Sequence, residues 1–173
     1  MTKPGDVIKF CFKCGSNKFV FDGNRSFQCL NCGFQFYINS SSAVAAIITD
    51  DKGRILLTER AHEPNKGFLD LPGGFVDPME SAEDAIIREI REELNLEITQ
   101  LTYLVSFPNE YIYSGFSVFT TDFGFIAEVK TFDTIQWNDD ISGFQFIEPD
   151  KINFERLSSY SIASIIKFYL FQN

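Results

Sequence analysis

The sequence lacks any apolar run near the roughly 18 uninterrupted residues that a membrane span requires. Its first residues hold no hydrophobic signal-peptide core. Basic residues are few, since 15 Lys and Arg stand against 24 Asp and Glu, and the formal net charge is −9. Phosphate contacts rely on Lys and Arg, so this balance disfavours binding to nucleic acid. These absences predict a cytoplasmic protein that has no membrane partner, and they disfavour a nucleic-acid partner.

What the chain does contain is typical of a globular protein. Its 173 residues suffice for one domain plus a small module. Hydrophobic residues make up 45% and charged residues 23%, close to the average of soluble domains. The 20 phenylalanines predict an aromatic-rich core.

All four cysteines lie near the beginning of the chain, as two C-x-x-C pairs separated by 14 residues: Cys11, Cys14, Cys29 and Cys32. Two such turns can present four thiolates to one tetrahedral ion. Gly15 and Gly33 follow the two pairs and suit tight turns. Two disulfides and a redox-active pair are the alternatives, and the absence of a secretion signal disfavours the disulfides. We therefore expect a zinc ribbon over residues 1–38 with a structural Zn²⁺.

The charges of the two parts of the chain differ in sign. Residues 1–36 hold five Lys or Arg and two Asp, a net charge of +3, so the remainder carries −12. A charge of +3 permits weak contact with a polyanion but is not the footprint expected of a nucleic-acid-binding module.

A second domain is expected over residues 43–173, after the polar segment at 38–42. Strand-like runs occur at 43–49, 54–60, 96–107, 115–129 and 142–147, and a loop with Gly and Pro spans 61–78. One helix follows Ser81, and an amphipathic helix lies within roughly 155–171. Strands mixed with two helices predict an α/β fold, a sheet covered by helices.

The helix after Ser81 carries an unusual distribution of charge. At about 100° per residue, one arc is apolar and is expected to face the core: Ile86, Ile87, Ile90 and Leu94. The neighbouring arc holds Glu89, Glu92 and Glu93, with Ala85 one turn earlier leaving room above them. Like charges at these spacings repel, and a divalent cation would relieve the repulsion. Oxygen ligands of this kind favour Mg²⁺ or Mn²⁺, whereas the simpler alternative is a solvated acidic face.

The segment 74–96 resembles the Nudix box, G-x5-E-x7-R-E-U-x-E-E-x-G-U, where U is aliphatic. Gly74, Glu80 and the run from Arg88 to Leu96 match at every specified position except the last glycine, which is Asn95. That position follows the helix end, where a left-handed residue is needed and Asn is the usual substitute for Gly. The resemblance implies a Nudix α/β/α sandwich with a mixed sheet.

The resemblance also implies a reaction, the metal-assisted hydrolysis of a nucleoside diphosphate linked to another group. Glu89, Glu92 and Glu93 would be the ligands of Mg²⁺ or Mn²⁺, and Gly73 would offer a carbonyl oxygen. Arg88 would orient the glutamates by ion pairing. The general base is left open between Glu89 and a later acid. The candidates for that acid are Asp133, Asp139 and Asp140.

Other residues are candidates for substrate binding. Arg60 ends a predicted strand near the box and could pair with a phosphate, or it could be a surface charge. Phe107 and Tyr111 could stack on a base, although an aromatic in this chain could equally belong to the core.

A ribbon ahead of a Nudix domain is similar to the arrangement in the NADH pyrophosphatases of this superfamily. Those enzymes carry a Ser-Gln-Pro-Trp run after the box, whereas the nearest stretch here is Ser106-Phe107-Pro108-Asn109. We therefore expect an ADP-ribose-like nucleotide as substrate, with NAD(H) as the runner-up. A non-catalytic nucleotide sensor is the alternative of another class. Relatives are often dimers, so a homodimer stays open.

Overall fold

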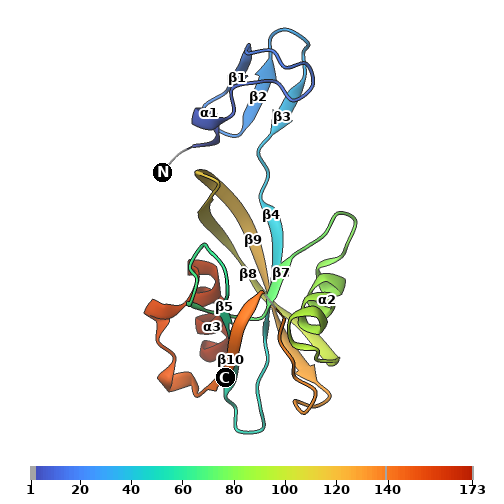
Figure 1. The fold of residues 1–173 in the computed structure, drawn as a ribbon, viewed down its shortest axis with the longest axis vertical. Helices are drawn as coiled ribbons and strands as arrows, with labels where there is room; N and C mark the ends of the chain where they lie inside the picture. Colours follow the sequence, from blue (N-terminus) through green and yellow to red (C-terminus); the bar gives the residue numbers. More distant parts are fainter. Residues whose placement is uncertain (1–2, 139, 173) are drawn as a thin grey trace. The chain divides into compact units, whose positions relative to one another are not determined.

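The computed structural model describes residues 3–138 and 140–172. These residues form two compact units, shown in Figure 1 with their labels. The first contains the residues up to Ser40 together with Glu110–Phe119, and the second contains Ser41–Asn109 and the residues from Thr120 onward. The chain passes between the units after Ser40, after Asn109 and after Phe119. The domain limits expected at residues 38 and 43 stay predictions.

The first unit is built around a three-stranded sheet. A short helix α1 (Pro4–Val7) precedes β1 (Phe19–Phe21), β2 (Ser26–Cys29) and β3 (Gln35–Tyr37), which pair antiparallel in the order β1-β2-β3. Phe19 and Phe27 stack with their ring centroids 5.0 Å apart. These two rings and the buried Cys11 and Cys29 form a small core. The sheet therefore has one face turned to a phenylalanine core and one face left outside it.

The second unit is a mixed α/β structure. Its strands are β4 (Ser41–Ile47), β5 (Ile55–Arg60), β6 (Leu69–Asp70), β7 (Gly73–Phe75), β8 (Ile98–Tyr113), β9 (Phe116–Val129) and β10 (Ile141–Ile147). Its helices are α2 (Ala82–Leu94) and α3 (Tyr160–Gln172), with 3-10 turns at Pro149–Lys151 and Phe154–Arg156. One sheet has the order β7-β4-β9-β8, with β4 parallel to β9 and antiparallel to β7. The other has the order β10-β5-β6.

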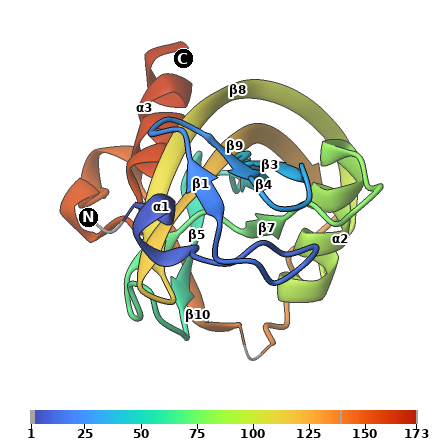
Figure 2. The ribbon, with the colours of Figure 1, turned by 90° about the horizontal axis from the view of Figure 1, so that it is seen from above.

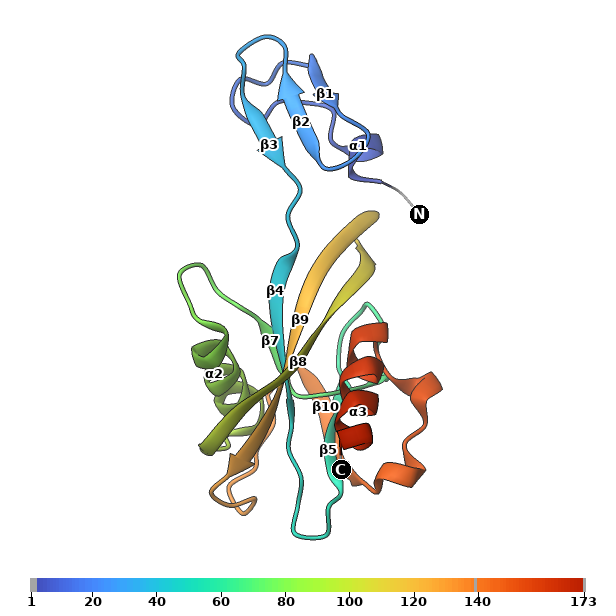
Figure 3. The same cartoon turned by 180° about the vertical axis from the view of Figure 1, so that it is seen from behind.

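Strand β4 separates two hydrophobic cores because successive side chains point to opposite faces of a strand. Val44 and Ala46 pack in the core that includes α2, whereas Ala45 and Ile47 pack in the core that includes α3. Figures 2 and 3 show the two helices on opposite sides of β4 and β9. The chain therefore has the expected α/β/α sandwich with a mixed sheet.

Several expectations about the elements need correction. Ile87 is 45% exposed and does not face the core, whereas Ala85 is fully buried instead of lying open beside the glutamates. The buried arc of α2 is thus rotated toward the carboxylates. The expected loop at 61–78 contains β6 and β7, and the final helix begins only at Tyr160.

Among the described residues, no helix has both the length and the apolar character needed to cross a bilayer.

Candidate functional site

Helix α2 has well-defined ends. The Ser81 hydroxyl accepts a hydrogen bond from the Asp84 backbone N–H at 3.1 Å, as an N-cap does. At the other end Asn95 is left-handed, with φ 53° and ψ 35°. The left-handed conformation expected at the departure from the Nudix box is therefore confirmed. The Asn95 side chain also donates to the Thr134 carbonyl at 3.0 Å, a contact that glycine cannot make.

Glu93 is the glutamate most closely tied to the loop before the helix. Its Oε2 accepts a hydrogen bond from the Gly73 backbone N–H at 3.0 Å. Burial raises the pKa of Glu93 to about 8, and the charges of Glu89, Asp70 and Asp140 act in the same direction, although the Gly73 N–H opposes them. A carboxylate shielded from water among other acids is the environment in which a bound cation gives the largest stabilisation.

Neighbouring atoms come too close to Gly73 and Gly74 for either position to hold a larger residue. Gly73 has φ 147°, and a methyl group on it would lie 2.1 Å from the Val44 carbonyl oxygen. A methyl group on Gly74 would lie 2.5 Å from Oε1 of Glu89. Strand β7 therefore runs beside β4 with the Glu89 carboxylate directly over its backbone, an approach that only glycine permits.

Arg88 holds the acidic side chains around it. Its guanidinium donates to both carboxylate oxygens of Glu80 at 2.9 Å, to Glu89 at 2.8 Å and to Glu92 at 3.2 Å. It also donates to the Phe75 carbonyl at 3.0 Å. The hydrogen bonds to Glu80 and Glu89 raise the pKa of Arg88 further above its usual value, although burial opposes them, so the guanidinium stays charged. One cation thus links the loop to two glutamates of the helix.

The acidic ridge, defined as Glu89, Glu92 and Glu93, is not closed around one point. Glu89 is 16% exposed in its side chain and Glu92 is 57% exposed, with Glu92 turned toward Arg88. Burial raises the pKa of Glu89, and Arg88 opposes that rise. Glu93 instead faces Gly73. The ridge offers carboxylate oxygens of three different exposures, so its members are not equivalent.

Asp70, which the sequence did not single out, belongs to the surroundings of Glu93. It ends β6, just before the glycine loop, and burial raises its pKa while hydrogen bonds from Ser158 and the charge of Arg60 oppose the rise. Its position immediately before Leu71-Pro72-Gly73-Gly74 is the one signal in the sequence that could have indicated it.

The later acids have different positions. Asp140 acts on the pKa of Glu93, as noted above. Asp133 accepts a hydrogen bond from the Thr131 hydroxyl at 2.9 Å. Asp139 lies outside the described residues.

The residues expected to bind substrate are engaged with other parts of the protein or lie elsewhere. Arg60 donates to Asp70 at 3.0 Å and to the Pro64 carbonyl at 2.9 Å. Phe107 meets Phe168 of α3 edge-to-face, with ring centroids 6.5 Å apart. Tyr111 is half-buried in the part of β8 that belongs to the first unit, whereas the acidic ridge belongs to the second. Their contact with a substrate stays a prediction.

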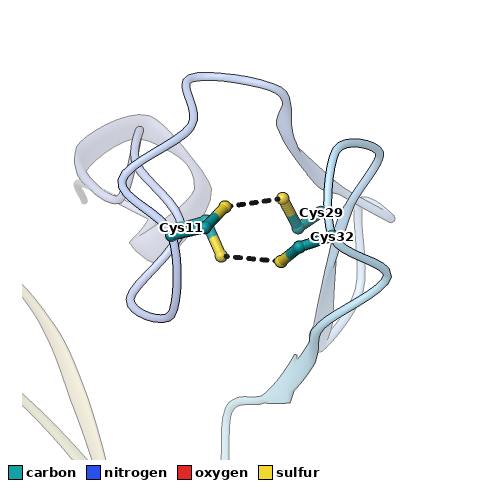
Figure 4. A group of neighbouring side chains, drawn as sticks. Cys11, Cys29 and Cys32 are labelled. Carbon is teal, nitrogen blue, oxygen red and sulfur yellow. Dashed lines mark hydrogen bonds between the residues drawn. The ribbon is translucent and has the colours of Figure 1, made fainter.

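The four cysteines converge as the sequence predicted (Figure 4). The sulfurs of Cys11 and Cys32 are 3.8 Å apart, and those of Cys14 and Cys29 are 3.7 Å apart. Four ligands at the usual Zn–S distance of about 2.3 Å form a tetrahedron with an edge of about 3.8 Å, so the sulfurs fit a zinc ion. In the described part of the chain, they are the only group of three or more His, Cys, Asp or Glu with all ligand atoms within 4.8 Å of one another.

The two cysteine turns have the same backbone pattern. The N–H of Gly15 donates to the Cys11 carbonyl at 2.8 Å, and the N–H of Gly33 donates to the Cys29 carbonyl at 2.9 Å. Both glycines have positive φ, 71° and 73°. Two equivalent turns thus face each other, which is consistent with the zinc ribbon.

Comparison with known proteins gives curated relatives that include NAD-capped RNA hydrolases. The chain is 28% identical over 148 residues to the NAD-capped RNA hydrolase NudC of Pseudomonas aeruginosa (strain PAO1), covering 83% of this chain and 49% of that protein. It thus spans about half the length of the curated relatives that it matches.

Solved structures of the same kind share the fold. A NUDIX hydrolase from Nitrosomonas europaea superposes with a TM-score of 0.70 at 21% identity, covering 96% of this chain and 92% of that one. The NUDIX domain of Shewanella oneidensis NrtR, solved in complex with ADP ribose, has a TM-score of 0.62 at 18% identity, covering 78% and 88%. The family model described as the NUDIX domain matches residues 40–166. Because that match includes β4, the glycine loop, the acidic ridge and most of α3, the chain belongs to the NUDIX family.

Proposed function

We propose that this protein is a pyrophosphohydrolase that depends on Mg²⁺ or Mn²⁺ and cleaves a nucleoside diphosphate linked to another group. The observation that carries this proposal is the partly buried Glu93 carboxylate, which Gly73 fixes by a backbone hydrogen bond beside Glu89 and Arg88. A non-catalytic acidic face would gain nothing from keeping carboxylates together against their mutual repulsion.

The oxygen donors of the acidic ridge have the chemistry that a hard divalent cation prefers. Members of this family use divalent metals, and carboxylate and carbonyl oxygens are the ligands that Mg²⁺ and Mn²⁺ favour. Glu89, Glu92 and Glu93 would hold the ion, together with the carbonyl of Gly73. When bound, it would neutralise charge on the diphosphate and make a bound water acidic enough to serve as the nucleophile.

The protein's own residues would set the geometry of this site. Arg88 positions Glu89 and Glu92 by ion pairing, and it is itself anchored on Glu80 and the Phe75 carbonyl. The group that would remove a proton from the attacking water is Glu89 or a later acid, among Asp133, Asp139 and Asp140. The charge of Asp140 acts on the pKa of Glu93, which places this acid in the surroundings of the acidic ridge.

The substrate class follows from family and relatives together. An ADP-ribose-like nucleotide is the first candidate, and ADP ribose is bound by the NrtR domain of the same fold. An NAD-linked substrate is the second candidate, favoured by the relatives named NAD-capped RNA hydrolases. The Zn²⁺ of the ribbon would be structural, because four thiolates leave no open coordination position. A cytoplasmic location and a homodimer stay predictions.

A panel of diphosphate substrates tests the proposal. We would incubate the protein and Mg²⁺ with ADP-ribose, NADH and an NAD-capped RNA, and measure the products. Glu92→Gln is expected to reduce turnover at least ~100-fold, the size of effect expected when charge stabilisation is lost. Glu83→Gln, an exposed change in the first turn of the same helix, is the matched control.

Two results would contradict the proposal. If the wild-type protein bound these nucleotides but hydrolysed none, it would be a sensor. Equal turnover by wild type and Glu92→Gln would remove the proposed role of the acidic ridge.

A further inference from the structure

The zinc ribbon has a surface that its own fold does not use. The inner face of its sheet packs Phe19, Phe21 and Phe27 into the core. Because side chains alternate along a strand, the opposite side forms a separate surface. We call this surface the outer face, and it consists of Lys18, Val20, Ser26, Gln28, Leu30, Gln35 and Tyr37.

The strand register places these residues in rows across the sheet. Val20 pairs with Gln28, which pairs with Gln35, and Ser26 pairs with Tyr37. A shallow pocket is lined by Val20, Gln28, Gln35 and their neighbours Asp22, Ser26 and Leu30. The outer face is therefore a continuous surface with a depression at its centre.

Apolar groups are unusually open on the outer face. Val20 is 49% exposed, Leu30 66% and Tyr37 47%. These three side chains lie on one face of the sheet, and they are open to contact by a partner.

The two ends of this surface carry positive charges. Lys18 lies at one end, beside Leu30, whose backbone N–H donates to the Lys18 carbonyl. Arg25 lies at the other end, with its guanidinium 6.0 Å from the centre of the Tyr37 ring. The one acid at the pocket, Asp22, uses one carboxylate oxygen to accept hydrogen bonds from the backbone N–H groups of residues 24–26. Its other oxygen accepts from the Ser26 hydroxyl at 2.7 Å. These hydrogen bonds lower the pKa of Asp22 to about 2, so it keeps its charge while both of its oxygens are engaged within the turn.

From this arrangement we infer that the outer face of the ribbon binds single-stranded RNA. Lys18 and Arg25 would contact phosphates, Tyr37 would stack on a base, and the amides of Gln28 and Gln35 would hydrogen-bond to base edges. A neutral or basic protein partner would not use the two cations, and a duplex would not use the stacking ring. The choice of RNA as the partner rests on the proposed function and on relatives named as RNA hydrolases.

This inference revises an expectation drawn from the sequence. The net charge of +3 for residues 1–36 is small, but a count does not show where charges lie. The sheet brings Lys18 and Arg25 to the two ends of one surface, which also holds a stacking ring.

Fluorescence anisotropy with a labelled 12-nucleotide RNA tests the inference. The zinc-loaded full chain would be titrated without added Mg²⁺, so that binding is measured whether or not the protein is a hydrolase. We expect Lys18→Glu combined with Arg25→Glu to weaken binding at least about tenfold at 50 mM salt. The slope of log affinity against log salt should fall by about 1.4, because each phosphate contact to a single strand contributes about 0.7.

Matched controls separate this effect from general charge and from misfolding. Lys52→Glu combined with Lys66→Glu makes the same charge change at two exposed lysines of the second unit and should bind RNA as the wild type does. Tyr37→Ala should weaken binding about fivefold or more, the value of one base stack, whereas Tyr37→Phe should not. Each variant should retain about one zinc per chain.

Three outcomes would overturn the inference. The wild type could fail to bind the RNA, it could bind a duplex as tightly as a single strand, or the outer-face variants could bind as the wild type does. A change of oligomeric state in Lys18→Glu/Arg25→Glu without RNA binding would instead assign the outer face to a second copy of the chain. Failure of the proposed hydrolase activity would appear only in the substrate panel, so the two proposals fail separately.

Discussion

Glu93 is more buried than Glu89 and Glu92 because it points in a different direction around the axis of α2. At about 100° per residue, Glu93 lies only about 20° around α2 from the fully buried Ile86. It therefore falls inside the buried arc, while Glu92 points outward toward Arg88. The sequence placed the three carboxylates on one arc, and Glu93 lies at the edge of that arc nearest the apolar side chains. The packing of α2 on β4 and β7 extends the buried arc far enough to include it.

Gly74 provides a test of how closely the ridge must approach the loop. A methyl group at this position would lie 2.5 Å from Glu89 Oε1, so the carboxylate would have to move. Small displacements of groups that position a reaction cost large factors in rate. We expect Gly74→Ala to reduce kcat at least about tenfold on the hydrolysed diphosphate, measured by steady-state kinetics.

Gly143→Ala is the matched control for that change. The backbone of Gly143 lies outside the left-handed region, so alanine is not strained there. A methyl group at this position would meet nothing within 4 Å. The kcat of Gly143→Ala should equal that of the wild type. If Gly74→Ala also turned over normally, the position assigned to Glu89 would be wrong.

At the scale of elements, the ends of α2 were the most predictable feature and the short strands the least. The Ser81 cap and the left-handed Asn95 follow from local chemistry, and both are observed. Strands β6 and β7 have two and three residues, and they exist because β5 and β4 pair with them. A sequence pattern cannot reveal a strand whose only cause is its partner. Strand β8 likewise continues to Tyr113, beyond the run predicted to end at 107.

Asn95 gives a prediction about the end of the helix. Its φ of 53° is costly for a residue with a Cβ and no local hydrogen bond. Asn95→Ala should therefore lower the free energy of unfolding by about 1 kcal/mol more than Asn95→Gly does. Urea denaturation of both variants measures the difference, and equal stabilities would show that the left-handed backbone carries no cost here.

At the scale of the whole molecule, the two units rely on different means of stability. The second has two large hydrophobic cores on either side of β4. The first has four buried core residues, two of which are cysteines. So small a core seldom supports a fold without a metal or a disulfide. The cysteine cluster was predictable because the spacing of the two C-x-x-C pairs specifies it. The mixed α/β fold was predictable from the order of strands and helices and from the resemblance to the Nudix box. The arrangement of charge on the ribbon was not predictable, because it depends on how the strands pair.

Removal of zinc should therefore affect one unit only. We expect a chelator, or Cys11→Ser, to expose residues 3–40 to limited proteolysis and to leave the second unit resistant. Elemental analysis should find about one zinc per chain before treatment and none after chelation. Ser16→Ala, a change in the same turn that leaves the sulfurs in place, is the control. A metal-free ribbon as resistant as the zinc-loaded one would contradict the structural role of the ion.

Titration with Mn²⁺, followed by electron paramagnetic resonance, measures whether the acidic ridge holds a divalent cation. The zinc-loaded wild type should remove Mn²⁺ from the free pool, and Glu83→Gln should do the same. Glu93→Gln should bind Mn²⁺ at least about tenfold more weakly, because it loses the charge of the carboxylate that Gly73 positions. Equal binding by wild type and Glu93→Gln, or no binding by the wild type, would contradict the account.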